Sequence, residues 1–123
     1  MSNKGWIGVD LDGTLAHYDG WKGLKHIGEP IVPMVERIKR WLSEGYEVRI
    51  FTARMSAGHD EFGMDRMDFV GALGEWLVKA GLPETLAVTN IKDFEMLELW
   101  DDRAVQVIEN TGVPIGGSSR GLS

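Results

Sequence analysis

Strand-like and helix-like segments alternate along this chain, and the alternation is the feature that most restricts its fold. Short apolar runs typical of buried strands lie at residues 6–11, 46–52, 86–89, 97–100 and 104–108. Apolar positions at helical spacing predict helices over residues 31–43 and 65–80, with a short helix near 93–95. Strands that alternate with helices of this length form parallel sheets with right-handed crossovers. We therefore expect an α/β fold around a mainly parallel sheet of about five strands.

The chain has 123 residues, which is enough for one domain with its own apolar core. Two loops rich in glycine and polar residues, 16–28 and 55–64, interrupt the alternation. We expect one domain over residues 1–111 and a mobile tail over 112–123, where glycine and serine accumulate.

Composition excludes several classes of protein. There is no cysteine, hence no disulfide and no thiolate nucleophile, and a reducing cytoplasm is the expected location. No apolar stretch is long enough to span a membrane, and the first residues lack the apolar core of a signal peptide. Thirteen Lys and Arg against nineteen Asp and Glu give a net charge of −6, which argues against binding nucleic acid irrespective of sequence.

Polar residues gather where the predicted strands end. Ligands of an open parallel sheet bind outside the carboxyl ends of its strands, because loops and helix N-termini converge there. Carboxylates brought together at that edge repel one another unless a cation lies among them, and oxygen ligands suit Mg²⁺. The residues at these ends are Asp10 and Asp12, Thr52 and Arg54, Lys92 and Asp93, and Asp101 and Asp102.

The Asp10-Leu11-Asp12-Gly13-Thr14 sequence is the most specific of these signals. Alternation in an extended segment places its two carboxyl groups on the same side. With this composition the pattern arises by chance roughly three times in a thousand such chains. The plain alternative is a strand that ends in an Asp turn.

Four motifs resemble those of the haloacid dehalogenase (HAD) superfamily phosphatases. Residues 9–15 look like motif one, Ile50-Phe51-Thr52 like motif two, Lys92 like motif three and Trp100-Asp101-Asp102 like motif four. Order and spacing agree over residues 5–110. The resemblance implies a three-layer Rossmann-like fold with the first strand central, and here without a separate cap domain.

The resemblance also implies roles for single residues. Asp10 would be the nucleophile that becomes an aspartyl-phosphate, and Asp12 the general acid and then the base. Thr52 and Lys92 would bind the transferring phosphoryl group. Mg²⁺ would be held by Asp10, the backbone carbonyl of Asp12 and the pair Asp101 and Asp102, either of which could be the direct ligand. An acid two residues after the nucleophile matches the phosphatases of the superfamily, so hydrolysis is favoured.

Further details are similar to the phosphatase half of bacteriophage polynucleotide kinase-phosphatase. They include Pro33-Met34-Val35, Gly45-Tyr46, Arg54, Lys92-Asp93 and Asp101-Asp102-Arg103. In that class an arginine at the Arg54 position and an aspartate at the Asp93 position matter for activity; guanidinium suits phosphate, so we expect Arg54 to bind it. The chain departs from the class in lacking a kinase phosphate-binding loop, in having a threonine, Thr52, where that motif has serine, and in having a lysine, Lys22, at the position expected for an arginine.

The expected site is uncapped and open. It could accept a bulky ester such as a nucleotide or a nucleic-acid 3′-phosphate, or a second subunit of a homo-oligomer could supply a lid. Trp21, Lys22, Lys25 and His26 could contact a base and its phosphate, although a packed Trp21 with solvated lysines is an equally good reading. The alternatives are a sugar or metabolite phosphatase, a phosphotransferase to another acceptor, and a non-catalytic phosphate-binding module.

Overall fold

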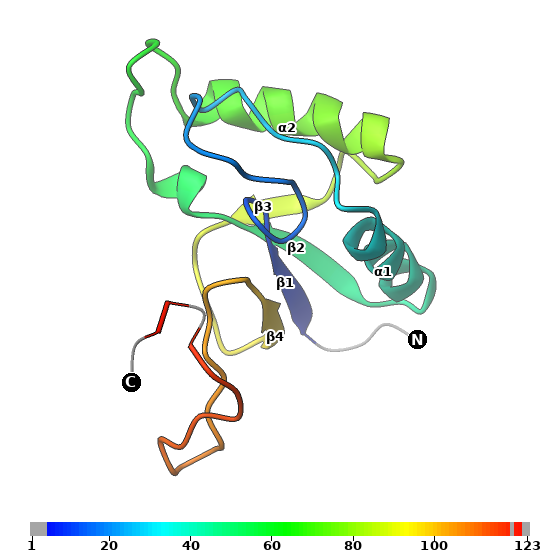
Figure 1. The fold of residues 1–123 in the computed structure, drawn as a ribbon. Coiled ribbons are helices and arrows are strands. Elements are labelled where there is room, and N and C mark those ends of the chain that lie inside the picture. The colour runs from blue at the N-terminus through cyan, green and yellow to red at the C-terminus, as the bar shows by residue number, and fades with distance from the viewer. Residues whose placement is uncertain (1–4, 119, 122–123) are drawn as a thin grey trace.

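The computed structural model describes residues 5–118 and 120–121. Four parallel strands form its sheet in the order β3-β2-β1-β4 (Figure 1). The strands are β1 (Trp6–Asp10), β2 (Glu47–Phe51), β3 (Ala87–Thr89) and β4 (Met96–Trp100). The predicted α/β class and parallel sheet are confirmed, and β1 lies in the interior of the sheet.

Two α-helices follow the apolar periodicity, α1 (Val32–Ser43) and α2 (Arg66–Ala80). Gly45, with a φ of 90°, lies just beyond the end of α1. The Asp65 carboxylate caps the first turn of α2, and Gly81 ends that helix in the left-handed conformation. Both helices agree closely with the predicted ranges 31–43 and 65–80, because their end signals are local in sequence.

Both helices pack on the same face of the sheet. Side chains alternate along a strand, so every second residue of β1 and β2 points to this face. These residues are buried in one core with the inner stripes of both helices; the principal members are Ile7, Val9, Val48, Ile50, Met34, Val35, Ile38, Phe69, Leu73 and Leu77. In the part of the chain that the structure describes, the helices form one layer on the sheet, whereas three layers were expected.

The connections bring the ends of β1 and β4 together. α1 joins β1 to β2, and α2 joins β2 to β3. The chain then returns past β1 through residues 90–95, with no helix, and forms β4 on the other side of β1. The strand order therefore reverses at β1, and this is where ligands bind in open parallel sheets.

A stack of side chains covers part of the other face. The Trp6 ring is fully buried, lies 6.5 Å from Phe51 and has the Arg49 guanidinium 4.4 Å from its centroid. The Trp6 indole N–H donates a hydrogen bond of 2.9 Å to Asp93. These contacts fix the loop between β3 and β4 against β1.

Two predicted elements are absent from the described chain. The short helix expected at residues 93–95 is a turn, in which the Asp93 carboxylate accepts the backbone N–H of Glu95. The strand expected at 104–108 pairs with no strand of the sheet; Val107 instead forms an isolated bridge with Pro114. The sheet consequently has four strands where about five were expected.

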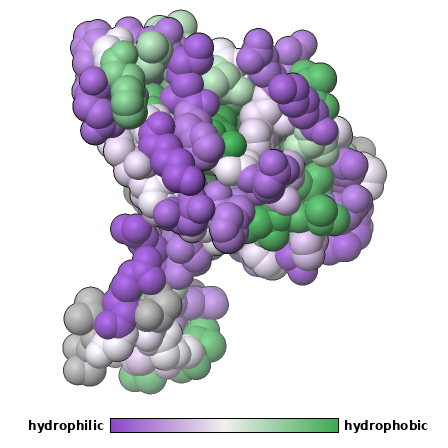
Figure 2. All heavy atoms as spheres, turned by 45° about the horizontal axis from the view of Figure 1, so that its top comes forward, coloured by the Kyte–Doolittle hydropathy of each residue, from purple (hydrophilic) through white to green (hydrophobic). Residues whose placement is uncertain are grey.

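Part of the C-terminal segment projects from the body of the molecule (Figure 1), although Arg120 lines the same pocket as Asp10 and Asp12. Figure 2 shows the projecting part as a separate lobe joined through a hydrophilic neck. Of the tail expected to be mobile, residues 112–118 and 120–121 are described, and the others lie outside the described residues.

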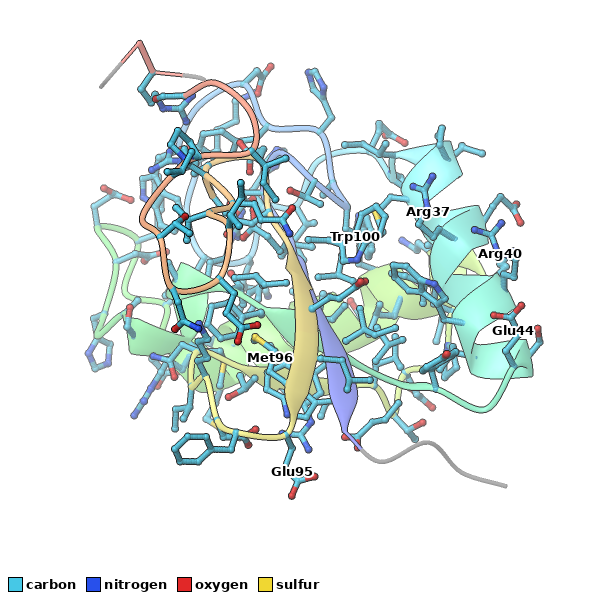
Figure 3. The ribbon with its side chains drawn as sticks, turned by 90° about the horizontal axis from the view of Figure 1, so that it is seen from below. Arg37, Arg40, Glu44, Glu95, Met96 and Trp100 are labelled. Atoms are coloured by element: carbon cyan, nitrogen blue, oxygen red, sulfur yellow. The ribbon has the colours of Figure 1, made fainter. Side chains whose placement is uncertain are left out.

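The end of β4 also contacts α1. Figure 3 shows Trp100 at the end of β4 beside Arg37 of α1, whose guanidinium lies 4.9 Å from the ring. Within the described residues, neither α-helix combines the length and apolar character that crossing a bilayer requires.

Candidate active site

A pocket of about 830 Å³ opens at the carboxyl ends of the strands. Strand β1 leads into it, because Asp10 ends the strand while the buried side chain of Leu11 anchors the turn that follows. The pocket is lined by Asp10, Asp12, Gly13, Tyr18, Trp21, Phe51, Thr52, Ala53, Arg54, Ser56, Ala57, Asn90, Asp101, Asp102, Arg103 and Arg120. Four of the five carboxylates predicted for this edge, Asp10, Asp12, Asp101 and Asp102, therefore line one pocket, and Asp93 is not among its lining residues.

Three of the carboxylates form a tight cluster. One oxygen each from Asp10, Asp101 and Asp102 lies within 4.8 Å of the other two. Asp10 comes from the end of β1, and the other two follow the end of the neighbouring β4. An all-oxygen set of this kind fits a hard cation such as Mg²⁺.

Gly13 and Thr14 permit this approach. A Cβ atom at Gly13 would lie 2.7 Å from an Asp102 carboxylate oxygen, and the φ of Gly13 is +89°. Both the close contact and the left-handed backbone conformation therefore favour glycine at this position. The Thr14 hydroxyl lies 3.2 Å from Asp102 Oδ1 and 3.4 Å from Asp10 Oδ2, and it accepts the Asp102 backbone N–H at 3.1 Å. The glycine and threonine of the motif thus bind the β1 end to the β4 end, a role that the sequence reasoning did not assign.

Asp10 has an unusual protonation equilibrium. Burial and the nearby carboxylates of Asp101 and Asp102 raise its pKa to about 8. A negative charge at Asp10 is costly without a cation, since its two neighbours repel it. The charge of the cluster therefore favours binding of a divalent ion, in agreement with its oxygen ligands.

Asp12 has a different environment, because Arg54 binds its carboxylate in a bidentate ion pair. Arg54 Nε and Nη2 donate to the two oxygens at 2.9 and 2.8 Å. The Arg54 side chain is only 5% exposed, and its Nη1 donates to the backbone carbonyls of Leu24 at 2.9 Å and Gly23 at 3.3 Å. All three guanidinium nitrogens are thus engaged, and Arg54 holds Asp12 where the sequence predicted contact with phosphate.

Thr52 follows β2 and is buried at the floor of the pocket. Its hydroxyl accepts the backbone N–H of Arg54 at 3.2 Å and so caps the short 3₁₀ helix η1 (Ala53–Ser56). The predicted phosphate ligand therefore also positions the arginine that binds Asp12.

The loop after β3 places its residues differently from the prediction. Lys92 is exposed and is not among the residues that line the pocket, whereas Asn90 is. Asp93 lies in the stack on the far face of the sheet, 3.7 Å from an Arg49 nitrogen. The indole hydrogen bond from Trp6 lowers the pKa of Asp93. This carboxylate therefore helps to hold the loop between β3 and β4 against the sheet.

Aromatic residues form one wall of the pocket. Trp21 is 45% exposed, donates its indole N–H to Glu61 at 2.8 Å and lies over the Arg54 guanidinium at 5.2 Å. Tyr18 is 40% exposed and lines the same pocket. Lys22 pairs with Asp19 at 3.0 Å in solvent. Sequence reasoning missed Tyr18, Asn90 and Arg103, because no local pattern marks loop residues that converge only in the fold.

Comparison of the chain with protein-family models, curated proteins and solved structures finds no match.

Proposed function

We propose that this protein is a Mg²⁺-dependent phosphomonoester hydrolase that acts through an aspartyl-phosphate at Asp10. One observation carries the proposal: a cluster of three carboxylates and a separately held fourth, Asp12, line the same pocket at the reversal point of the sheet. The resemblance of residues 9–15 and of the three later motifs to HAD phosphatases supplies the roles.

The residues present fit the metal ion. Asp10, Asp101 and Asp102 would hold Mg²⁺, together with the Asp12 backbone carbonyl that the resemblance implies. The ion would supply positive charge that offsets the repulsion between the Asp10 carboxylate and a phosphate dianion. That repulsion is of the order of 8 kcal/mol at 4 Å with an effective dielectric constant of 20.

In the first step, an Asp10 carboxylate oxygen forms a bond to phosphorus while the bond from phosphorus to the leaving oxygen breaks. In its protonated form Asp12 donates a proton to that oxygen, and the products are an aspartyl-phosphate, the Asp12 carboxylate and a free alcohol. Thr52, and Lys92 after rotation of its exposed side chain, bind the transferring group.

In the second step, water attacks the phosphorus and Asp12 accepts the proton that the water loses. The bond to Asp10 breaks and inorganic phosphate is released. The two steps require the same Asp12 to act first as acid and then as base, so its carboxylate must stay aligned throughout the cycle. The bidentate contact with Arg54 provides that alignment.

For the substrate, we favour a nucleotide or a nucleic-acid 3′-phosphate. The exposed rings of Trp21 and Tyr18 line the pocket, and base–aromatic stacking is worth about 1–3 kcal/mol per base. A small sugar or metabolite phosphate is the second candidate. A chain without cysteine fits a cytoplasmic location for either reaction.

Release of phosphate from p-nitrophenyl phosphate tests the reaction. We expect activity with Mg²⁺, none in EDTA and none for Asp10→Asn. Glu84→Gln removes an exposed carboxylate outside the pocket and should retain full activity. An active Asp10→Asn variant would contradict the mechanism, and a wild type inactive on aryl, nucleotide and sugar phosphates would favour the non-catalytic module.

Preference for nucleic acid is tested separately. A 3′-phosphorylated oligonucleotide is compared with mononucleotides and sugar phosphates by kcat/KM. We expect the substrates that carry a base to be preferred, and equal values for all of them would favour the second candidate.

A further inference from the structure

Two loops that are far apart in sequence pack on each other beside the pocket. We call residues 17–29 the first loop and residues 57–64 the second loop (Figure 1). The Trp21 indole of the first loop donates to Glu61 of the second. Gly23 also faces the second loop, because a Cβ atom there would lie 2.8 Å from the Phe62 ring.

Asp60 is the main polar link between the two loops. Its Oδ1 accepts the backbone N–H groups of Phe62 and Met64 at 2.8 and 2.9 Å, which closes the second loop on itself. Its Oδ2 accepts the backbone N–H of Leu24 at 2.7 Å, which attaches the first loop. One carboxylate thus satisfies three backbone donors from two loops.

Leu24 connects this link with the reaction site. Its side chain is fully buried, its N–H is bound by Asp60, and its carbonyl accepts Arg54 Nη1 at 2.9 Å. Arg54 in turn holds both oxygens of Asp12. A continuous path of hydrogen bonds therefore leads from Asp60 through one buried residue and one guanidinium to Asp12.

From this path we propose that Asp60 is a positioning residue for the reaction, which aligns the Asp12 acid through Leu24 and Arg54. The inference rests on the proposed function. Asp60 lines neither the pocket nor the carboxylate cluster, so it acts only through the residues in between. Displacement of the Leu24 carbonyl would let the guanidinium shift, and a misplacement of about 1 Å can lower a rate by about 10²-fold.

Substrates with different leaving groups distinguish such a positioning role from a purely structural one. An alkoxide is a poor leaving group and needs the proton of Asp12, whereas p-nitrophenolate leaves without it. For kcat/KM, which reports the first step when that step is irreversible, loss of Asp12 alignment should matter for alkyl phosphates and little for p-nitrophenyl phosphate. A residue that only stabilises the fold would affect both substrates equally.

The experiment measures kcat/KM of Asp60→Ala and Asp60→Asn on p-nitrophenyl phosphate and on glycerol phosphate, with Mg²⁺ present. We expect the loss on glycerol phosphate to exceed the loss on p-nitrophenyl phosphate by about tenfold or more. Asp60→Asn retains the size of the side chain but cannot accept all three donors as a carboxylate does, so it serves if Asp60→Ala does not fold. Equal losses on the two substrates would overturn the inference.

Asp65→Ala is the matched control. Asp65 is another carboxylate next to the second loop that accepts backbone N–H groups, but it caps α2, and among the described residues its side chain accepts no hydrogen bond from Leu24 or Arg54. Loss of such a cap lowers the free energy of unfolding of the whole chain. We expect it to leave the ratio of the two kcat/KM values unchanged; a ratio that shifts as in the Asp60 variants would also overturn the inference.

A double variant tests the path itself. Arg54→Lys removes the bidentate contact, so adding Asp60→Asn to it should not change the substrate ratio further. Additive effects would place Asp60 outside the path. These outcomes are distinct from failure of the proposed function, in which the wild type itself releases no phosphate from either substrate.

Discussion

The two aspartates of the first motif lie two residues apart and have opposite electrostatic surroundings. Asp12 is neutralised by Arg54, which also donates to two backbone carbonyls, so this half of the pocket is complete within the chain. Asp10 faces Asp101 and Asp102, and its pKa is raised to about 8. The difference teaches that two carboxylates of one short motif can differ completely in environment: Asp10 lies among other carboxylates, whereas Asp12 is bound by a guanidinium.

The largest effect is expected at Asp10, within the cluster of three carboxylates. Asp10→Asn removes the nucleophile while its amide keeps the size of the side chain, and it should lower kcat by about 10³-fold or more. Steady-state phosphate release measures the effect, with circular dichroism as the check on folding. Activity within tenfold of the wild type would remove the distinction between the two aspartates.

The next effect is expected from the neutralised half. Arg54→Lys keeps a positive charge but loses the fork that holds both Asp12 oxygens, so kcat on alkyl phosphates should fall by about 10²-fold. Unchanged kinetics would show that the ion pair is unrelated to turnover.

Agreement between sequence and structure is close where the signals are local and poorer where they depend on distant partners. The helices α1 and α2 and the first strand ends were predicted well, because their periodicity and caps lie within a few residues. The Arg54–Asp12 pair spans 42 positions in the sequence. An arginine close to a predicted phosphate site does not reveal that its guanidinium binds a carboxylate of the chain instead.

Other hydrogen bonds of the same residues explain why the helix predicted at 93–95 and the strand predicted at 104–108 are not found in the described chain. Asp93 favours a turn because its carboxylate accepts the N–H of Glu95 and the indole N–H of Trp6, a contact 87 positions away. Residues 104–108 have the apolar character of a strand, yet a strand needs a partner edge, and here the Ile108 N–H pairs with Val113 instead.

The pH dependence of stability distinguishes the two halves without turnover. The folded pKa of Asp10, about 8, exceeds its ordinary value of 3.8, so the folded chain retains a proton that the unfolded chain releases between these values. In metal-free protein the free energy of unfolding should therefore fall as pH rises through this window. Mg²⁺ should restore it.

Asp10→Asn should flatten that dependence. At the upper end of this pH window, the free energy of unfolding of the variant should be about 1–2 kcal/mol higher than that of the metal-free wild type. This figure is reduced to account for solvent screening of a half-buried carboxyl. Urea unfolding with and without Mg²⁺ provides the measurement. A wild type whose free energy of unfolding changes with neither pH nor Mg²⁺ would argue against a raised pKa of Asp10 and against metal binding at the cluster.

The smallest effect is expected at the aromatic wall. Trp21→Ala should raise KM for substrates that carry a base by about tenfold, in line with the loss of one stacking contact, and leave KM for glycerol phosphate unchanged. Phe94→Ala, at an exposed ring outside the pocket, is the control. An equal rise for both kinds of substrate would assign Trp21 to loop structure alone.

The most direct test of the account is to trap the phosphoryl group between its two steps. In Asp12→Asn the base of the second step is lost, while p-nitrophenyl phosphate can still react in the first. With Mg²⁺, acid quenching and peptide mass spectrometry should find a phosphoryl group on Asp10 that the wild type does not accumulate. Steady turnover of this variant without any label at Asp10 would contradict the division of labour between the two aspartates.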